Sequence, residues 1–437
     1  MLKKKNFTRK FAAALLASVM LFNSCSEEQV IHEQKNQTEI TLSWWGNDTR
    51  NEYTLDAVAL FEKAYPETKV KCSYSEWSGY EARNQVRMAS GNETDVMQIN
   101  VGWLSQYSPD GTGYYDIEEL SDYIDLSNFP EEMLNYGRRN GVLNAIPIAM
   151  NAETLYFNKN IYDSYGLELP KTWDDLFAAA KKMKADGVYP LAGADKSIWL
   201  YCICYAEQMS GKSILNADSS LNFGAEELQL MIDFYCNMVE GQVIPKIEDF
   251  QRYNIDNGVY AGVIAWVSDA LNYFKGPIEE GKTIVAGSYT VKDGLESGEG
   301  WYAKPATLYA VSKNTKHPKE AGELLDYMLN SPEWAELQGV EKGIPVSKSA
   351  RAQLEKEGQL TGLQYEASVV METNENIRPM DSTLEKSDMY NSFYDACNLV
   401  LYDKADAASA ALELYYKYCP EKAPKDETAT EDVAAIG

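Results

Sequence analysis

Aromatic and polar side chains follow three predicted strands in the first quarter of this 437-residue chain, at the point where each strand ends. They are Trp44, Trp45, Asn47 and Asp48 after the first strand, Glu76, Trp77 and Tyr80 after the second, and Asn100 and Trp103 after the third. A sugar ring has apolar C–H faces that stack on indole and hydroxyls that need carboxylate or amide partners. The set predicts a carbohydrate-binding rim, although Trp44 is assigned to the core because it continues the alternation of Ile40 and Leu42.

A second group of candidate ligand-binding residues lies further along the chain. It consists of Asn151, Trp199, Trp266, Asp269 and Trp301. An apolar strand over residues 258–266 ends in Trp266 and is followed by Asp269, so an indole and a carboxylate again meet at a strand end. A tryptophan wedged under the next helix is the alternative for Trp266. If the rim binds sugar, Trp266→Ala and Trp45→Ala each weaken binding by at least ~1 kcal/mol, as expected when an anchor ring is truncated.

The many carboxylates raise the alternative of a secreted glycoside hydrolase. Such an enzyme needs two carboxyl groups about 5 to 10 Å apart across one bond. Glu76, Asp95 and Asp269 are candidates, but no spacing in the sequence pairs any two of them. Asp95 is better explained as a strand-entry residue that accepts backbone hydrogen bonds. We therefore expect no enzymatic activity, and a receptor for a non-sugar solute or a sensor protein remains the third alternative.

Charge and composition argue against other classes. The net charge of −26 would repel phosphate backbones, so we expect no nucleic-acid partner. His32 and His317 are the two histidines of the chain and lie far apart in the sequence, so we expect neither a metal site nor any cofactor. The 30 tyrosines and nine tryptophans outnumber the 12 phenylalanines, which favours rings with polar edges at a wet surface.

Strand and helix signals alternate in the N-terminal part. A strand over 40–44 precedes a capping box from Thr49 to Glu52, and strands over 69–74 and 95–100 flank a helix over 79–90. This βαβαβ order predicts a parallel open sheet with helices on both faces, in which ligands bind beyond the carboxyl ends of the strands.

The stretch from Asn144 to Lys159 contains two extended segments separated by a polar break at residues 151–154. We interpret the break as a crossing between two lobes, with one bent, buried strand as the alternative. Further crossings are predicted near residues 298–302 and 343–346. Thr172 to Asp175 opens the second lobe with a helix that Gly187 ends. A strand is expected over 189–192, and helices over 197–209, 225–239, 318–329, 332–338, 384–401 and 405–418.

Residues 1–24 have a basic end and an apolar run over 11–22 that is short for a membrane span, as in an export signal peptide. The signal ends at Asn23-Ser24-Cys25, which resembles a lipoprotein processing site; simple secretion is the alternative to lipidation of Cys25. Residues 25–38 are then the lipidated cysteine and a flexible tether, and 420–437 a disordered tail. Six further cysteines allow fifteen pairings, none of which the spacing selects.

Several motifs in a fixed order resemble one known family. They are Ser43-Trp-Trp-Gly-Asn-Asp48, Thr94-Asp-Val-Met-Gln-Ile-Asn100, the run from Pro147 to Lys159, Pro170-Lys-Thr-Trp-Asp-Asp175 and Gly262-Val-Ile-Ala-Trp266. Together they are similar to family 1 extracellular solute-binding proteins, the maltodextrin-binding-protein type of receptor that delivers sugars to ABC importers. The resemblance covers about residues 39 to 419.

The resemblance implies an α/β, two-lobe periplasmic-binding-protein-like fold of type II, in which each lobe is an open α/β sheet and crossing segments form a hinge. The expected N-terminal lobe comprises residues 39–150 and 303–345, and the expected C-terminal lobe 151–302 and 346–419. The implied partners are a carbohydrate, in particular an oligosaccharide, and the membrane subunits of an ABC importer. The chain is expected to be a monomer that is exported and lipid-anchored to the outer face of the bacterial cell membrane, or periplasmic.

Overall fold

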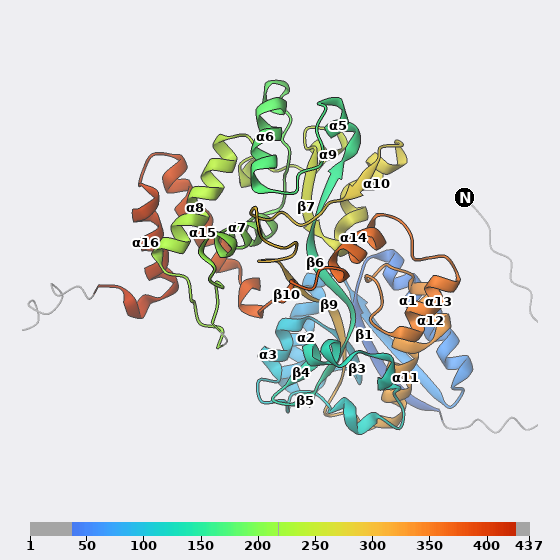
Figure 1. Ribbon diagram of the computed structural model, residues 1–437. Coiled ribbons are helices and arrows are strands. Elements are labelled where there is room, and N and C mark those ends of the chain that lie inside the picture. The colour runs from blue at the N-terminus through green and yellow to red at the C-terminus, as the bar shows by residue number, and fades with distance from the viewer. Residues whose placement is uncertain (1–36, 217, 425–437) are drawn as a thin grey trace, which may run out of the picture.

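The computed structural model describes residues 37–216 and 218–424. The signal peptide, Cys25, nearly all of the expected tether and the tail from residue 425 lie outside these ranges. Two lobes lie one above the other in Figure 1, and the long strands β6 (Ala145–Asn158) and β9 (Tyr302–Val311) run from one into the other. The expected two-lobe α/β fold is confirmed.

The N-terminal lobe contains the predicted βαβαβ unit. It consists of β1 (Thr38–Trp45), α1 (Asp48–Ala64), β2 (Thr68–Ser75), α2 (Trp77–Ser90) and β3 (Val96–Ile99), followed by α3 (Val101–Tyr107). Strand β1 pairs in parallel with both β2 and β3, and the sheet order is β2-β1-β3-β9-β6. The carboxyl ends of β1, β2 and β3 therefore lie at one edge, as expected.

The two faces of this sheet have different cores. Ile40, Leu42 and Trp44 point to one face, where they pack with Phe61 of α1 and with α11 (Pro318–Asn330) and α12 (Pro332–Gln338). Trp44 is fully buried there, which confirms its assignment to the core. Because neighbouring residues of a strand point to opposite faces, Trp45 packs on the other side, with the aromatic residues of α2 and α3.

Three segments connect the lobes. The first half of β6 pairs with β9 in the N-terminal lobe, and the second half pairs with β7 (Gly262–Trp266) and β8 (Ile284–Ala286) in the C-terminal lobe. The predicted crossing at 343–346 only runs alongside β6, where Pro345 is bridged to Ala149 and Val346 N donates to Ile148 O at 3.0 Å. The chain then forms α13 (Lys348–Lys356) on the N-terminal lobe, so the third connection follows at residues 357–362, before α14 (Leu363–Glu372). Gly343 has a φ of +98°, and a Cβ there would lie 2.8 Å from the Ala149 Cβ, so glycine is required at this contact with β6.

The predicted polar break in β6 is not an interruption. The strand is continuous, and its irregularity lies around Ala149, where the register with β9 shifts. Asn151, Glu153 and Thr154 are buried within the sheet, where Asn151 donates to Ser268 and Glu153 accepts from Ser197.

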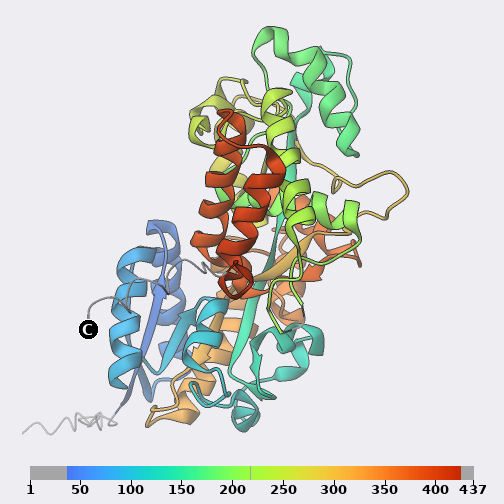
Figure 2. The ribbon, with the colours of Figure 1, turned by 90° about the vertical axis from the view of Figure 1, so that its left-hand side faces the viewer.

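The C-terminal lobe has helices on both sides of β6, β7 and β8. One side carries α6 (Trp173–Met183), α7 (Asp195–Ser210), α8 (Ala225–Glu240), α15 (Ser387–Leu401) and α16 (Ala407–Tyr418), and the other α10 (Ala270–Glu279) and α14 (Leu363–Glu372). Figure 2 shows α15 and α16 in red over the flank of this lobe. The short helices α5 (Lys159–Ser164) and α9 (Tyr253–Asp256) lie in the same lobe (Figure 1).

Two expectations for the C-terminal lobe need correction. Residues 189–193 form isolated parallel bridges to Tyr260 and Ile264 and no continuous strand. Helix α13 (Lys348–Lys356), which was expected in this lobe with the rest of 346–419, belongs to the N-terminal lobe because Ala350 and Leu354 pack on Ala335 of α12. The N-terminal lobe also contains the short elements α4 (Glu131–Leu134), β4 (Arg138–Arg139) and β5 (Val142–Leu143).

Candidate functional site

Four of the predicted rim residues form one aromatic cluster on the N-terminal lobe. The Trp45 ring lies edge-on to Trp77 at 4.8 Å between centroids and 5.3 Å from Tyr80. Trp103 of α3 stacks on Tyr80 and on Trp77, in each case with 6.0 Å between centroids. The carboxyl ends of β1, β2 and β3 thus bring these rings together, as the sequence pattern predicts.

Only part of this cluster is open to a ligand. Trp77 is 36% exposed and Trp45 is half-buried, whereas Tyr80 and Trp103 are almost completely buried. The Tyr80 hydroxyl donates to Gln98 O at 2.6 Å, so its polar group is already used inside the sheet. Tyr80 and Trp103 therefore support the two outer rings from behind and are not open to a ligand in this structure.

The polar residues at the same strand ends serve mainly as helix caps. Asn47 is the N-cap of α1 and accepts from Arg50 N, so the helix begins two residues before the predicted capping box at Thr49. Asn100 caps α3 by accepting from Gly102 N. Asp48 in the first turn of α1 and Glu76 before α2 are exposed, and the Glu76 side chain makes no capping bond. Both caps use side-chain oxygens that the prediction assigned to ligand.

Cross-strand pairing gathers a second group of side chains on one face of the central sheet. Glu153 of β6 lies opposite Trp266 of β7, and Asn151 of β6 lies opposite Lys304 of β9. Because directly paired residues share a face and alternate residues of a strand do too, all four side chains lie on the same side of the sheet. Trp266 and Asn151, predicted separately, are thus brought together with two charged residues that the prediction missed.

Two lysines face the Trp266 indole. Lys304 Nζ lies 4.5 Å from the ring centroid and Lys196 Nζ, at the start of α7, lies 5.6 Å from it. Both ammonium groups also pair with Glu385 of the 3-10 helix η7 (Ser382–Glu385), the Lys196 contact being 2.8 Å. Part of the Trp266 ring that was expected to stack on a sugar is therefore covered by cations.

The Glu153 carboxyl is buried beside this group. Its Oε1 accepts from Ser197 Oγ at 2.9 Å, while Oε2 has no hydrogen-bond partner among the described protein atoms. Burial raises the pKa of Glu153 to about 8, against smaller opposing contributions from the Ser197 hydrogen bond and the two lysines. At neutral pH this carboxyl is mostly protonated and can donate a hydrogen bond.

The remaining candidates divide into fixed polar residues and core residues. Asn151 donates to Ser268 Oγ at 3.0 Å and accepts from Ser268 N, and Asp269 accepts from Asn272. Trp199 and Trp301 are buried in the core of the C-terminal lobe, with Trp301 Nε1 bonded to Thr290 O. Neither ring is open to a ligand in this structure, because α7 and the segment before β9 turn both into the core.

The two groups of residues lie on opposing lobes that touch each other. Helix η7, which carries Glu385, lies against α3, which carries Trp103. The aromatic cluster and the lysine pair therefore flank one junction between the lobes.

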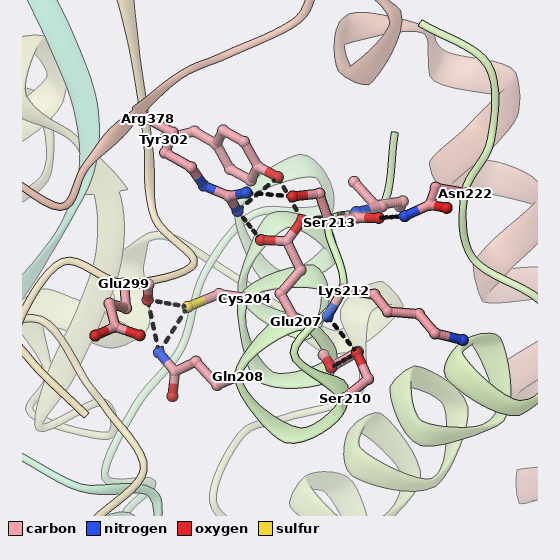
Figure 3. Close-up of polar contacts among 12 residues, drawn as sticks. Cys204, Glu207, Gln208, Ser210, Lys212, Ser213, Asn222, Glu299, Tyr302 and Arg378 are labelled. Carbon is pink, nitrogen blue, oxygen red and sulfur yellow. Dashed lines mark hydrogen bonds and ion pairs between the residues drawn. The ribbon is translucent and has the colours of Figure 1, made fainter. Parts of the chain in front are cut away.

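A separate polar cavity of about 450 Å³ opens on the C-terminal lobe. At its base Arg378 pairs with buried Glu207 and donates to Ser213, and the Tyr302 hydroxyl donates to Glu207 at 2.5 Å (Figure 3). A neighbouring cavity of about 290 Å³ shares Ser213 and Arg378 and extends to Leu384 of η7. No sequence signal marked these residues, because Arg378 and Glu207 meet only through the pairing of β10 (Arg378–Pro379) with β9.

The described residues also bear on metal binding, disulfide bonds and membrane-spanning helices. No group of three or more His, Cys, Asp or Glu in residues 37–216 and 218–424 lies so that it could hold a metal ion. The six cysteines in these ranges are free thiols: Cys72, Cys202, Cys204, Cys236, Cys397 and Cys419. None of the helices in this part of the chain is long and apolar enough to cross a bilayer.

Comparisons with known proteins agree with this architecture. The sequence model of a family described as bacterial extracellular solute-binding protein matches residues 45–333. A solved periplasmic solute-binding protein from Pectobacterium atrosepticum is similar with a TM-score of 0.81 and 29% identity, covering 88% of this chain and 98% of that one. A periplasmic oligogalacturonide-binding protein from Yersinia enterocolitica, in complex with saturated digalacturonic acid, is similar with a TM-score of 0.77 and 29% identity, covering 87% and 97%. The multiple sugar-binding protein of Streptococcus mutans is 22% identical over 72% of this chain and 76% of its own length.

Proposed function

Because this chain belongs to the family of bacterial extracellular solute-binding proteins, we propose that it captures a sugar, in particular an oligosaccharide, between its two lobes for an ABC importer. It is a solute-binding receptor of ABC import and not an enzyme, so the hydrolase alternative is set aside. Consistent with this, Asp95 accepts from Thr41 N, Thr41 Oγ1 and Thr315 Oγ1, which is a structural role in the sheet.

The observation that supports a sugar best is the exposed face of the aromatic cluster at the lobe junction. Trp77 presents an indole that a pyranose face can cover, and Trp45 lies beside it. On the other lobe Trp266, Glu153 and Ser268 offer a ring edge and polar groups for hydroxyls. The Streptococcus mutans relative is a sugar-binding protein by name, and the Yersinia protein holds an acidic disaccharide, which supports the same class of ligand.

Binding would work through a population shift between open and closed arrangements of the lobes. We assign residues 39–150 and 303–345, together with α13, to one lobe. Residues 151–302 and 357–419 form the other. The crossings at Ala149, at residues 304–307 and at residues 357–362 would form the hinge. A ligand that touches both lobes binds the closed form more tightly and shifts the equilibrium toward it, and the importer would recognise that form. Export and a lipid anchor at Cys25 complete the proposal.

The test is a melting-temperature screen of residues 26–437 against neutral and acidic mono- and oligosaccharides. A ligand that binds only the folded state raises the midpoint by mass action. A rise with one group of sugars that Trp77→Ala abolishes, while Tyr253→Ala on the exposed surface of α9 preserves it, supports the proposal. No rise with any sugar, together with a rise for a non-sugar solute, would refute it.

A further inference from the structure

One carboxylate at the lobe junction forms ion pairs with two ammonium groups. Glu385 Oε2 pairs with Lys196 and its Oε1 pairs with Lys304. Lys304 is nearly buried and Lys196 is partly exposed, so the pair lies at the boundary between core and solvent. The Glu385 carboxylate and the Trp266 ring are the groups that face both cations in the described contacts.

The three charges come from segments that meet where the lobes meet. Lys304 lies on the crossing strand β9, Lys196 at the start of α7, and Glu385 on η7, which contacts α3 of the opposite lobe. A ligand enclosed between the lobes would therefore be close to the lysines. The flat ring of Trp266 beneath them fits a sugar ring whose substituent reaches the ammonium groups.

The other acidic residues of this surface compensate the positive charge of the two lysines only in part. The Glu153 carboxyl is mostly neutral near pH 7 because burial raises its pKa to about 8. Asp269 accepts from Asn272 on its own helical turn, and exposed Asp195 accepts from the Lys196 backbone N at the start of α7. Neither forms an ion pair with Lys196 or Lys304, so among residues 37–216 and 218–424 Glu385 is the carboxylate that does so. Because two lysines share one carboxylate, one positive charge remains uncompensated and can pair with a second carboxylate.

We propose that this site selects an acidic sugar, and that the ligand's carboxylate binds Lys196 and Lys304 on the Trp266 face, in competition with Glu385 or beside it. This inference rests on the proposed function and adds the charge of the ligand. The Glu153 Oε2, which has no hydrogen-bond partner among the described protein atoms, lies buried behind the same group. A neutral sugar would leave the lysines bound to Glu385 alone and would gain nothing from them.

The experiment compares one ligand with and without its charge. Binding of digalacturonic acid, of its dimethyl ester and of a neutral disaccharide panel is measured by calorimetry at two salt concentrations. We expect the acid to bind at least ~10-fold more tightly than the ester and to weaken as salt is raised, because screening acts on the charged pair alone. Equal binding of acid and ester, or binding of neutral sugars only, would overturn the inference while the proposed function stands. Failure of every sugar to bind overturns both.

Variants separate a ligand role from a structural one. Lys196→Met keeps the Lys304–Glu385 pair and should reduce the preference for the acid over its ester at least ~5-fold. Glu385→Gln removes the competing carboxylate and should leave the acid bound at least as tightly, whereas a purely structural triad would lose all binding in this variant. Lys159→Met is the control, since its pair with Asp163 lies on the exposed surface of α5. An unchanged acid preference in folded Lys196→Met would refute the assignment.

Discussion

Glu153 on β6 and Trp266 on β7 are directly paired across the sheet, with the carboxyl buried and the indole partly exposed. The strand alternation that turns Trp266 toward the lobe junction therefore places an acid beside it. Burial raises the pKa of that acid from 4.5 to about 8, so the folded protein binds a proton that the unfolded chain releases.

This proton makes part of the stability depend on pH. The contribution is fully present below about pH 4.5, the ordinary value, and is lost as the pH rises toward 8. The total loss is on the order of 5 kcal/mol above pH 8, since each pKa unit corresponds to about 1.4 kcal/mol. Glu153→Gln, which remains neutral, should therefore gain stability relative to the parent protein as the pH rises from 5 to 9.

Urea unfolding of both proteins at pH 5, 7 and 9 measures the difference and cancels the other titrating groups. If the difference in unfolding free energy between Glu153→Gln and the parent protein stays constant over this range, Glu153 is ionised in the folded protein. If the difference instead grows with pH in favour of Glu153→Gln, the carboxyl is neutral in the folded protein.

Trp77→Ala should weaken binding of the cognate sugar by about 1 to 2 kcal/mol, because an exposed ring contributes its stacking face only when ligand is present. The free energy of unfolding should change by less than about 1 kcal/mol, since the ring is 36% exposed. Tyr80→Phe is the counterpart: it removes the bond to Gln98 O and should lower stability by about 1 kcal/mol without changing affinity. Titration calorimetry and urea unfolding check both, and a loss of affinity in Tyr80→Phe alone would reverse the assignment.

Asp95→Ala should destabilise the N-terminal lobe and leave ligand chemistry untouched. Its two oxygens accept three hydrogen bonds that link the start of β3 to Thr41 of β1 and to Thr315 after β9. Loss of these bonds should cost about 2 to 3 kcal/mol of unfolding free energy. Sugar incubated with either protein should stay intact, and hydrolysis by the parent that disappears in Asp95→Ala would restore the enzyme alternative.

Local signals predicted the fold well because each depends on neighbouring residues. The capping box of Thr172 and Asp175 is present at the start of α6, and Gly187 ends the following turn with a φ of +70°. The alternation in β1 separated Trp44 from Trp45 correctly. Helix α13 went unpredicted because only Ala350 and Leu354 of its nine residues are buried, which leaves no apolar stripe to detect.

The site was harder to predict because burial depends on tertiary packing. A tryptophan looks alike in sequence whether it is buried or exposed. Trp199 lies in a helix whose apolar residues extend around most of its surface, and α8 and α15 cover that helix. The lysines that face Trp266 come from β9 and α7, and nothing near them in sequence marks them as partners. The β6–β9 and β6–β7 registers place Lys304 on the Trp266 face, whereas Lys196 reaches it only through the packing of α7 on the sheet.

Arg378→Met should lower the free energy of unfolding of the protein more than the loss of an exposed ion pair does. It keeps much of the side-chain volume but leaves buried Glu207 without its cation, which should cost about 1 to 3 kcal/mol because the Arg378 side chain is 39% exposed and Glu207 keeps its bonds from Tyr302 and Ile214 N. The exposed pair of Lys159 and Asp163 is the matched control, and Lys159→Met should cost less than about 1 kcal/mol.

The pH dependence of this variant identifies the cause. Burial raises the pKa of Glu207 and Arg378 opposes that rise, so the pKa of Glu207 should climb further without the arginine. The folded variant then binds a proton more tightly than its unfolded chain, and its deficit relative to the parent protein should shrink as the pH falls from 7 to 5. Glu207→Gln in the Arg378→Met background should recover part of the loss at pH 7, because no charge is then left buried. If the deficit is the same at both pH values and the double variant recovers nothing, lost packing of the arginine stem and not the unpaired carboxylate causes the destabilisation.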